Sequence, residues 1–65
     1  MKSLRQYPAR IKYSLTEAGV KQKELAGALG IEPETLSRKL RRPEMFTLGE
    51  MYVIQAFFRW PTLEG

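Results

Sequence analysis

The sequence predicts an all-α fold, a single domain of four helices. Apolar residues recur three and four positions apart, as on one face of a helix, and no segment shows the strict alternation of a half-buried strand. Glycine and proline residues stand where four such segments begin or end. A chain of 65 residues is also too short for a second domain.

The first helix is predicted over residues 8–18. Pro8 suits the start of a helix and favours an extended residue before it. Gly19 can adopt the left-handed conformation that commonly follows the last turn. Residues 1–7 are therefore expected to form a loose basic arm.

The second and third helices are predicted over residues 21–29 and 33–41. Gly30 ends the second helix in the same left-handed way, and Pro33 suits the first position of the third. Pro43 prevents the third helix from continuing. The short connection favours two helices that cross steeply.

The fourth helix is predicted to begin after Thr47. Thr47 and Glu50 have the spacing of a capping box, in which each side chain accepts a hydrogen bond from the other residue's backbone N–H. Pro61 closes this helix. The domain is therefore expected to span residues 8–60, with 61–65 as a C-terminal tail.

The composition excludes most catalytic chemistry. The chain contains no His, Cys, Asp or Asn, so it lacks imidazole, thiolate and most zinc ligand sets. We expect no enzyme, no catalytic residue, no metal or cofactor and no small-molecule ligand. No apolar run approaches the roughly 20 residues that span a membrane, and the N-terminus lacks the apolar region of a signal peptide. A cytoplasmic protein without a membrane partner is expected.

The charge of the chain is concentrated in the third helix. The net charge of +4 and the pI near 9.8 favour an anionic partner. Leu36 and Leu40 lie on one side of the helical wheel, and Arg38 lies opposite them. Taken alone, this pattern favours the charged outside of an ordinary amphipathic helix. The steep crossing after the second helix shifts the balance towards a surface that meets a polyanion.

Residues 21–51 carry a family resemblance. The matching positions are Gln22, Leu25-Ala26, Gly30-Ile31, Leu36-Ser37 and Leu40, followed by "FTLGE" at the next helix. In these features the chain resembles a phage repressor/Cro-type (XRE-like) helix-turn-helix domain, with the motif at about residues 21–42. The resemblance implies a compact lambda-repressor-like fold of four helices, or five where another follows. Lys21 departs from the family, which usually has Thr or Ser there.

The resemblance also implies a function, sequence-specific binding of double-stranded DNA by a small transcriptional regulator, a repressor of phage or mobile-element type. By position, the residues that would contact bases are Pro33, Glu34, Thr35 and Arg38. Arg38 would bond to a guanine, while Glu34 would either accept from a cytosine or pair with Arg38 on the helix surface. The expected phosphate contacts are Lys21, Gln22, Lys23, Ser37, Lys39, Arg41 and Arg42.

The fourth helix has more apolar residues than one buried stripe requires. Met51, Ile54 and Phe58 suit the core. The surplus residues are Tyr52, Val53, Phe57 and Trp60. They predict a homodimer interface that would place two copies on half-sites about 34 Å apart. The alternative is a protein-interaction module, such as an antitoxin or accessory factor, that docks a partner through this helix.

Overall fold

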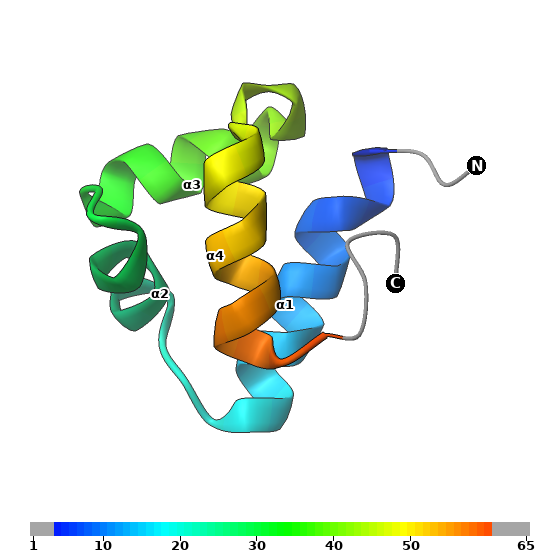
Figure 1. The fold of residues 1–65 in the computed structure, drawn as a ribbon, viewed down its shortest axis with the longest axis vertical. Helices are drawn as coiled ribbons and strands as arrows, with labels where there is room; N and C mark the ends of the chain where they lie inside the picture. Colours follow the sequence, from blue (N-terminus) through cyan, green and yellow to red (C-terminus); the bar gives the residue numbers. More distant parts are fainter. Residues whose placement is uncertain (1–3, 61–65) are drawn as a thin grey trace.

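The computed structural model describes residues 4–60, which form four α-helices and two short 3-10 helices (Figure 1). In chain order the elements are η1 (Leu4–Gln6), α1 (Tyr7–Ala18), α2 (Gln22–Leu29), α3 (Pro33–Arg41), η2 (Pro43–Met45) and α4 (Leu48–Phe58). No strand occurs within these residues, so the prediction of an all-α fold with four helices is confirmed. None of the described helices has the length and hydropathy needed to cross a membrane. The predicted tail lies outside the described residues.

The prediction of a loose arm is wrong for residues 4–7. Leu4–Gln6 form a 3-10 helix, and Tyr7 is the first residue of α1 rather than an extended residue. Pro8 at the second helical position is tolerated because backbone N–H groups in the first turn have no partner within the helix. The Tyr7 ring packs edge-on against Phe46, with ring centroids 5.4 Å apart, which secures this end of α1. The arm's first three residues lie outside the described part.

The ends of the helices follow local signals. Gly19 and Gly30 adopt left-handed backbone conformations, with φ of 67° and 72°, after α1 and α2. The predicted capping box opens α4: the Glu50 N–H donates to Thr47 Oγ1 over 3.1 Å, and the Thr47 N–H donates to Glu50 Oε1 over 2.9 Å. Arg59 ends α4 with a φ of 58°, a conformation that favours glycine.

The replacement Arg59→Gly is expected to stabilise the fold by about 0.5 to 1 kcal/mol, because a side chain in the left-handed region costs energy that glycine avoids. Urea unfolding monitored by circular dichroism measures the effect. Gly19→Ala is the matched control and should destabilise the chain, since it introduces the same strain elsewhere. A loss of stability in Arg59→Gly would contradict the strain argument.

All four helices contribute to one core. The buried side chains are Ile11, Leu15, Leu25, Ala26, Leu36, Leu40, Phe46 and Ile54. The apolar positions predicted to face inwards therefore do so, and Met51 and Phe58 pack against this core from α4. Ala26 is fully buried, and its small side chain lets α2 approach its neighbours closely.

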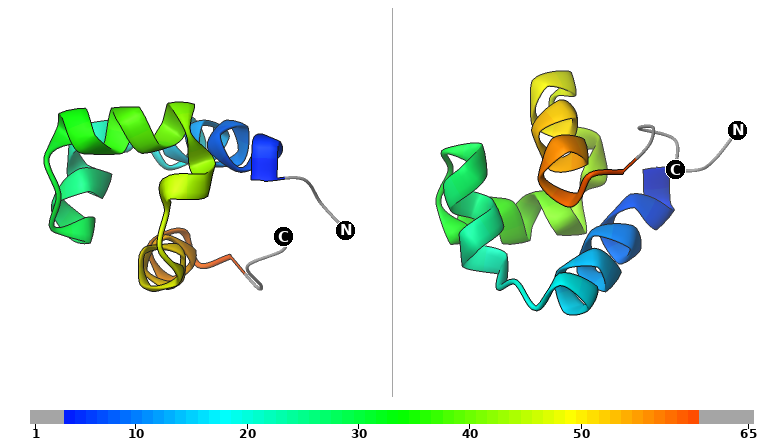
Figure 2. Two further views of the ribbon diagram at one scale, coloured as in Figure 1. Left: turned by 90° about the horizontal axis from the view of Figure 1, so that it is seen from above. Right: turned by 60° about the horizontal axis from the view of Figure 1, so that its bottom comes forward.

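The positions of α3 and α4 determine which surfaces the domain presents. In the left view of Figure 2, α3 runs across the top of the molecule, and α4 is seen end-on below it. The buried residues of both helices belong to the same core, which lies between them. The outward sides of α3 and α4 therefore point away from each other.

Candidate nucleic-acid interface

A tight turn joins α2 to α3. After Gly30 ends α2, the Ile31 N–H donates to the Ala26 carbonyl over 3.0 Å, and the Gly30 N–H donates to the Gly27 carbonyl over 3.1 Å. These two bonds satisfy carbonyl groups at the end of α2. Ile31 is half-buried against the core, which holds the turn in place. From it α3 leaves in a different direction from α2 (Figure 2).

All four residues predicted to contact bases are at least partly exposed on α3. Leu36 and Leu40 are buried, so the opposite side of the helix faces outwards. On that side Glu34 and Arg38 are exposed and Thr35 is half-exposed. Pro33 stands exposed at the first helical position. The structure therefore brings these residues together on one accessible helix.

Three guanidinium groups in and just after the last turn of α3 have no acidic partner among the residues that the structure describes. Arg38, Arg41 and Arg42 are exposed, and no ion pair in residues 4–60 involves them. The alternative in which Glu34 pairs with Arg38 is therefore not formed. The charges of these arginines are available to an anion, and their position near the helix C-terminus is favourable for cations.

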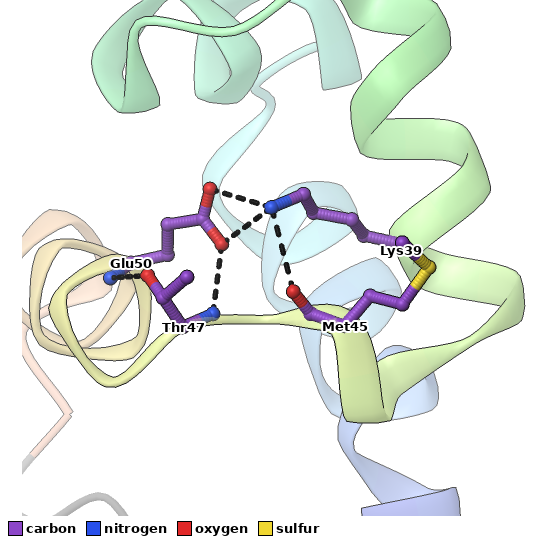
Figure 3. Close-up of polar contacts among 4 residues, drawn as sticks. All are labelled: Lys39, Met45, Thr47 and Glu50. Carbon is purple, nitrogen blue, oxygen red and sulfur yellow. Dashed lines mark hydrogen bonds and ion pairs between the residues drawn. The ribbon is translucent and has the colours of Figure 1, made fainter.

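Lys39 differs from the other cations of α3. Its ammonium group donates to both carboxylate oxygens of Glu50, over 2.7 and 2.8 Å, and lies 3.5 Å from the Met45 carbonyl oxygen (Figure 3). The two charged side chains are only 13% and 15% exposed. Lys39 was predicted to contact phosphate, but here it joins α3 to the start of α4. A phosphate would have to compete with this ion pair.

Glu50 serves two helices at once. The carboxylate that accepts from Lys39 also accepts from the Thr47 N–H that opens α4 (Figure 3). Burial raises the pKa of the Glu50 carboxyl, but hydrogen bonds from Lys39 and Thr47, with the charge of Lys39, outweigh that effect. The pKa therefore falls below its ordinary value of 4.5. Glu50 thereby fixes the end of α3 against the first turn of α4.

The replacement Glu50→Gln is expected to lower the free energy of unfolding by about 1 kcal/mol at neutral pH. Glutamine can still cap α4, so the change isolates the charge that holds Lys39. Because folding lowers this pKa, the contribution of Glu50 is present above about pH 4.5 and is lost as the pH falls through the folded-state value. The difference between parent and variant should therefore shrink in acid.

Urea unfolding at several pH values measures this difference. Glu44→Gln is the matched control, because Glu44 is exposed and makes no ion pair within the described residues. It should leave stability unchanged at neutral pH. If Glu50→Gln and the parent had the same free energy of unfolding at every pH, the ion pair would contribute nothing to stability.

The start of α2 is less open to an anion than the sequence predicted. Lys21 and Lys23 are exposed and Gln22 is half-buried, so both lysines remain accessible. However, the Lys21 N–H donates to the Glu24 carboxylate over 2.9 Å. This bond is the half of a capping box that Glu24 supplies, and it occupies the N–H of the N-cap residue; no side chain takes the place of the missing Thr or Ser, which would accept from an N–H inside the helix. The spacing of Lys21 and Glu24 is that of a capping box, a signal that could have revealed this bond.

The surplus apolar residues of α4 divide into two groups. Tyr52, Val53 and Phe57 are 56%, 39% and 38% exposed, so they are accessible as predicted. Trp60, predicted to belong with them, packs inside the domain. Its indole N–H donates to Ser14 Oγ over 3.1 Å, and its ring lies 3.8 Å beneath the Arg10 guanidinium. Trp60 thus secures the end of α4 to α1 and is not part of the outward surface.

Comparisons of the chain with protein-family models, with curated proteins and with solved structures found no match. Among the described residues, no group of three His, Cys, Asp or Glu residues could hold a metal ion. The observations that bear on function are therefore the accessible side of α3 and the accessible side of α4.

Proposed function

We propose that the chain binds double-stranded DNA with α3 as the recognition helix of a helix-turn-helix, and acts in the cytoplasm as a small transcriptional regulator, a repressor. The observation that carries the proposal is the outward side of α3. It combines the exposed Glu34 and the half-exposed Thr35 near the start of the helix with three guanidinium groups that form no ion pair within residues 4–60. A helix of this kind fits the major groove, where its N-terminal half meets the base edges.

The proposal assigns different tasks to the side chains. Arg38 donates two hydrogen bonds to a guanine, and Glu34 accepts from a cytosine amino group. Thr35 and Pro33 complete the contact with the bases. The residues assigned to phosphate are Lys21, Gln22, Lys23, Ser37, Arg41 and Arg42. Lys39 leaves this set because Glu50 holds it.

A binding experiment tests the proposal. Selection of bound duplexes from a random pool should yield a consensus, and a twofold-symmetric consensus would indicate two copies on one site. For a selected duplex, the logarithm of the association constant should fall linearly with the logarithm of salt concentration, with a slope of about −0.9 per phosphate contact. If no duplex binds above non-specific strength at low salt, the proposal fails.

One observation favours a second function, a protein-interaction module that docks a partner through α4, as an antitoxin or accessory factor would. Tyr52, Val53 and Phe57 expose apolar surface on one side of that helix. Exposed apolar patches of this kind mark interaction sites. Failure to bind DNA at low salt, together with a partner whose binding is lost in Val53→Glu, would favour this function over the first.

A further inference from the structure

A cleft lies between the C-terminal halves of α1 and α4. Both helices run towards the lower end of the molecule in Figure 1, and residues from each line the cleft, together with Val20 from the turn after α1. Its volume of about 380 Å³ lies near the lower end of the range of about 300 to 1,000 Å³ for small-molecule sites. The cleft therefore suits a ligand the size of an amino acid better than a nucleotide cofactor.

Arg59, which lines the cleft, has a backbone conformation that costs stability. Its φ is 58°, and it is the only residue other than glycine with a positive φ in the described part of the chain. A positive charge near a helix C-terminus is favourable, but an arginine within the last turn of α4 would supply it without strain. Strained residues cluster at ligand sites, where the side chain has a task. The strain is explained if the Arg59 guanidinium meets a ligand in the cleft.

Glu17, which also lines the cleft, is unfavourably placed for stability as well. It lies in the last turn of α1, where the helix macrodipole disfavours a negative charge. Neither Glu17 nor Arg59 forms an ion pair within residues 4–60, although both line one small cleft. The cleft therefore presents one unpaired carboxylate and one unpaired guanidinium.

Ser14 and a cluster of aromatic rings complete the cleft. The Ser14 hydroxyl accepts from the Trp60 indole N–H over 3.1 Å, and its own proton has no acceptor among the described residues. Phe58 stacks on Trp60 with ring centroids 5.4 Å apart, and it meets Phe57 edge-on at 5.1 Å. Phe57 and Phe58 both line the cleft, so a further ring can extend this cluster.

We propose that the cleft binds a free α-amino acid with a large apolar side chain, above all an aromatic one. The ammonium group of the ligand donates to the Glu17 carboxylate. The ligand's carboxylate accepts from the Arg59 guanidinium and the Ser14 hydroxyl. Its side chain packs against Phe57 and Phe58. One ligand thereby supplies a partner for each unpaired polar group of the cleft.

Other small molecules match the cleft less well. A purely cationic ligand would leave Arg59 without a partner, and the net charge of +4 would repel it. A purely anionic ligand would leave Glu17 without a partner and would be repelled by that carboxylate. The sequence predicted no small-molecule ligand, because Glu17 and Arg59 belong to helices far apart in the chain and line one cleft only in the fold.

The single tryptophan of the chain reports binding, because the Trp60 indole is bonded to Ser14 in the cleft. Titration with L-phenylalanine should change its fluorescence, with a dissociation constant of about 1 mM because the site is open and its charges are exposed. Phenylpropanoate lacks the ammonium group, and phenethylamine lacks the carboxylate. Each should bind about three- to tenfold more weakly than phenylalanine.

Two variants test which protein charge meets which group of the ligand. Glu17→Gln should bind phenylalanine more weakly but phenylpropanoate at least as tightly as the parent does. Arg59→Gly should bind phenylalanine more weakly but phenethylamine at least as tightly. Glu44→Gln and Lys12→Gln are the matched controls, because they remove the same charges from exposed residues outside the cleft. They should leave all three affinities unchanged.

Arg59→Gly also separates binding from stability. This variant is expected to be more stable than the parent and yet to bind phenylalanine less tightly, which a merely structural role of Arg59 would not produce. Arg59→Lys keeps the charge at the same position and should recover most of the affinity. An affinity for phenylalanine in Arg59→Lys as low as that in Arg59→Gly would contradict a contact between this charge and the ligand.

Three results would overturn the proposal. The first is an equal affinity for phenylalanine and for either truncated ligand, and the second is an unchanged affinity in both Glu17→Gln and Arg59→Gly. The third is that phenylalanine at about 10 mM, well above the expected dissociation constant, changes neither Trp60 fluorescence nor the amide NMR signals of residues 13–18 and 57–60. None of these measurements involves DNA, so they leave the function proposed for α3 untouched.

Discussion

Replacing Leu36 with alanine is expected to leave much of the chain unfolded at room temperature. Leu36 is completely buried and is one of only two buried anchors of α3. Loss of a buried leucine side chain costs about 2 to 5 kcal/mol, because the cavity closes only partly. A domain below about 70 residues rarely holds more than 3 to 5 kcal/mol in total. The change is therefore comparable with the whole stability of the fold.

Thermal and urea unfolding, monitored by circular dichroism at low protein concentration, measure the effect. Leu48→Ala removes the same atoms from a position that is 60% exposed, and it should change stability by less than about 0.5 kcal/mol. The contrast separates the loss of core packing from the loss of leucine itself. Equal stability in the two variants would mean that α3 does not depend on its burial in the core.

The sequence predicted those features of the fold that depend on neighbouring residues. Gly19 and Gly30 end their helices because a left-handed residue is needed within one turn of the last helical position. Thr47 and Glu50 form their capping box across only three positions. The spacing of the two leucines of α3 also predicted which side of the helix is buried and which is exposed. In each case the interaction is local, so the residue types and their spacing are enough to predict it.

Two errors in the predicted surfaces involve contacts between distant residues. Lys39 and Glu50 are 11 positions apart, and Trp60 and Ser14 are 46 apart. A helical wheel places Lys39 at the margin of the exposed face but cannot show that the next helix offers it a carboxylate. Likewise, an aromatic residue after the last turn of a helix looks unpartnered until the chain folds back against α1. The prediction therefore included one cation, Lys39, and one aromatic residue, Trp60, that are engaged inside the domain.

The relative direction of two surfaces was also beyond sequence reasoning. The prediction joined a DNA contact through the third helix with a dimer through the fourth, as parts of one assembly on one operator. In the structure α3 and α4 run in different directions, with α4 seen end-on below α3 in the left view of Figure 2. Each prediction concerned a single helix. Whether a DNA contact through α3 and a dimer contact through α4 can serve one assembly depends on how both helices pack around the core. The relative direction of the two surfaces therefore cannot be predicted from the sequence of either helix alone.

If α3 reads DNA, Arg38→Ala is expected to weaken binding to the selected duplex by about 1 to 3 kcal/mol, or about 5- to 150-fold. The loss should be largest for the preferred base at one position and small for other bases there, because a bidentate contact to guanine is removed. Arg38 is exposed and makes no ion pair in the described residues, so the folded structure should not change. Competition between duplexes that differ at single positions measures the effect.

Arg42→Ala removes the same kind of group about one turn further along, at the residue that follows α3, where a guanidinium would meet phosphate rather than a base edge. Its effect should be uniform across sequences, and the slope of log K against log salt should become smaller by about one. Both arginines are exposed and lack an acidic partner within residues 4–60, so a difference between the variants cannot come from a lost ion pair. If both variants lose affinity uniformly and shift the slope alike, Arg38 contacts phosphate as Arg42 does. The assignment of Arg38 to a base and of Arg42 to phosphate would then be wrong.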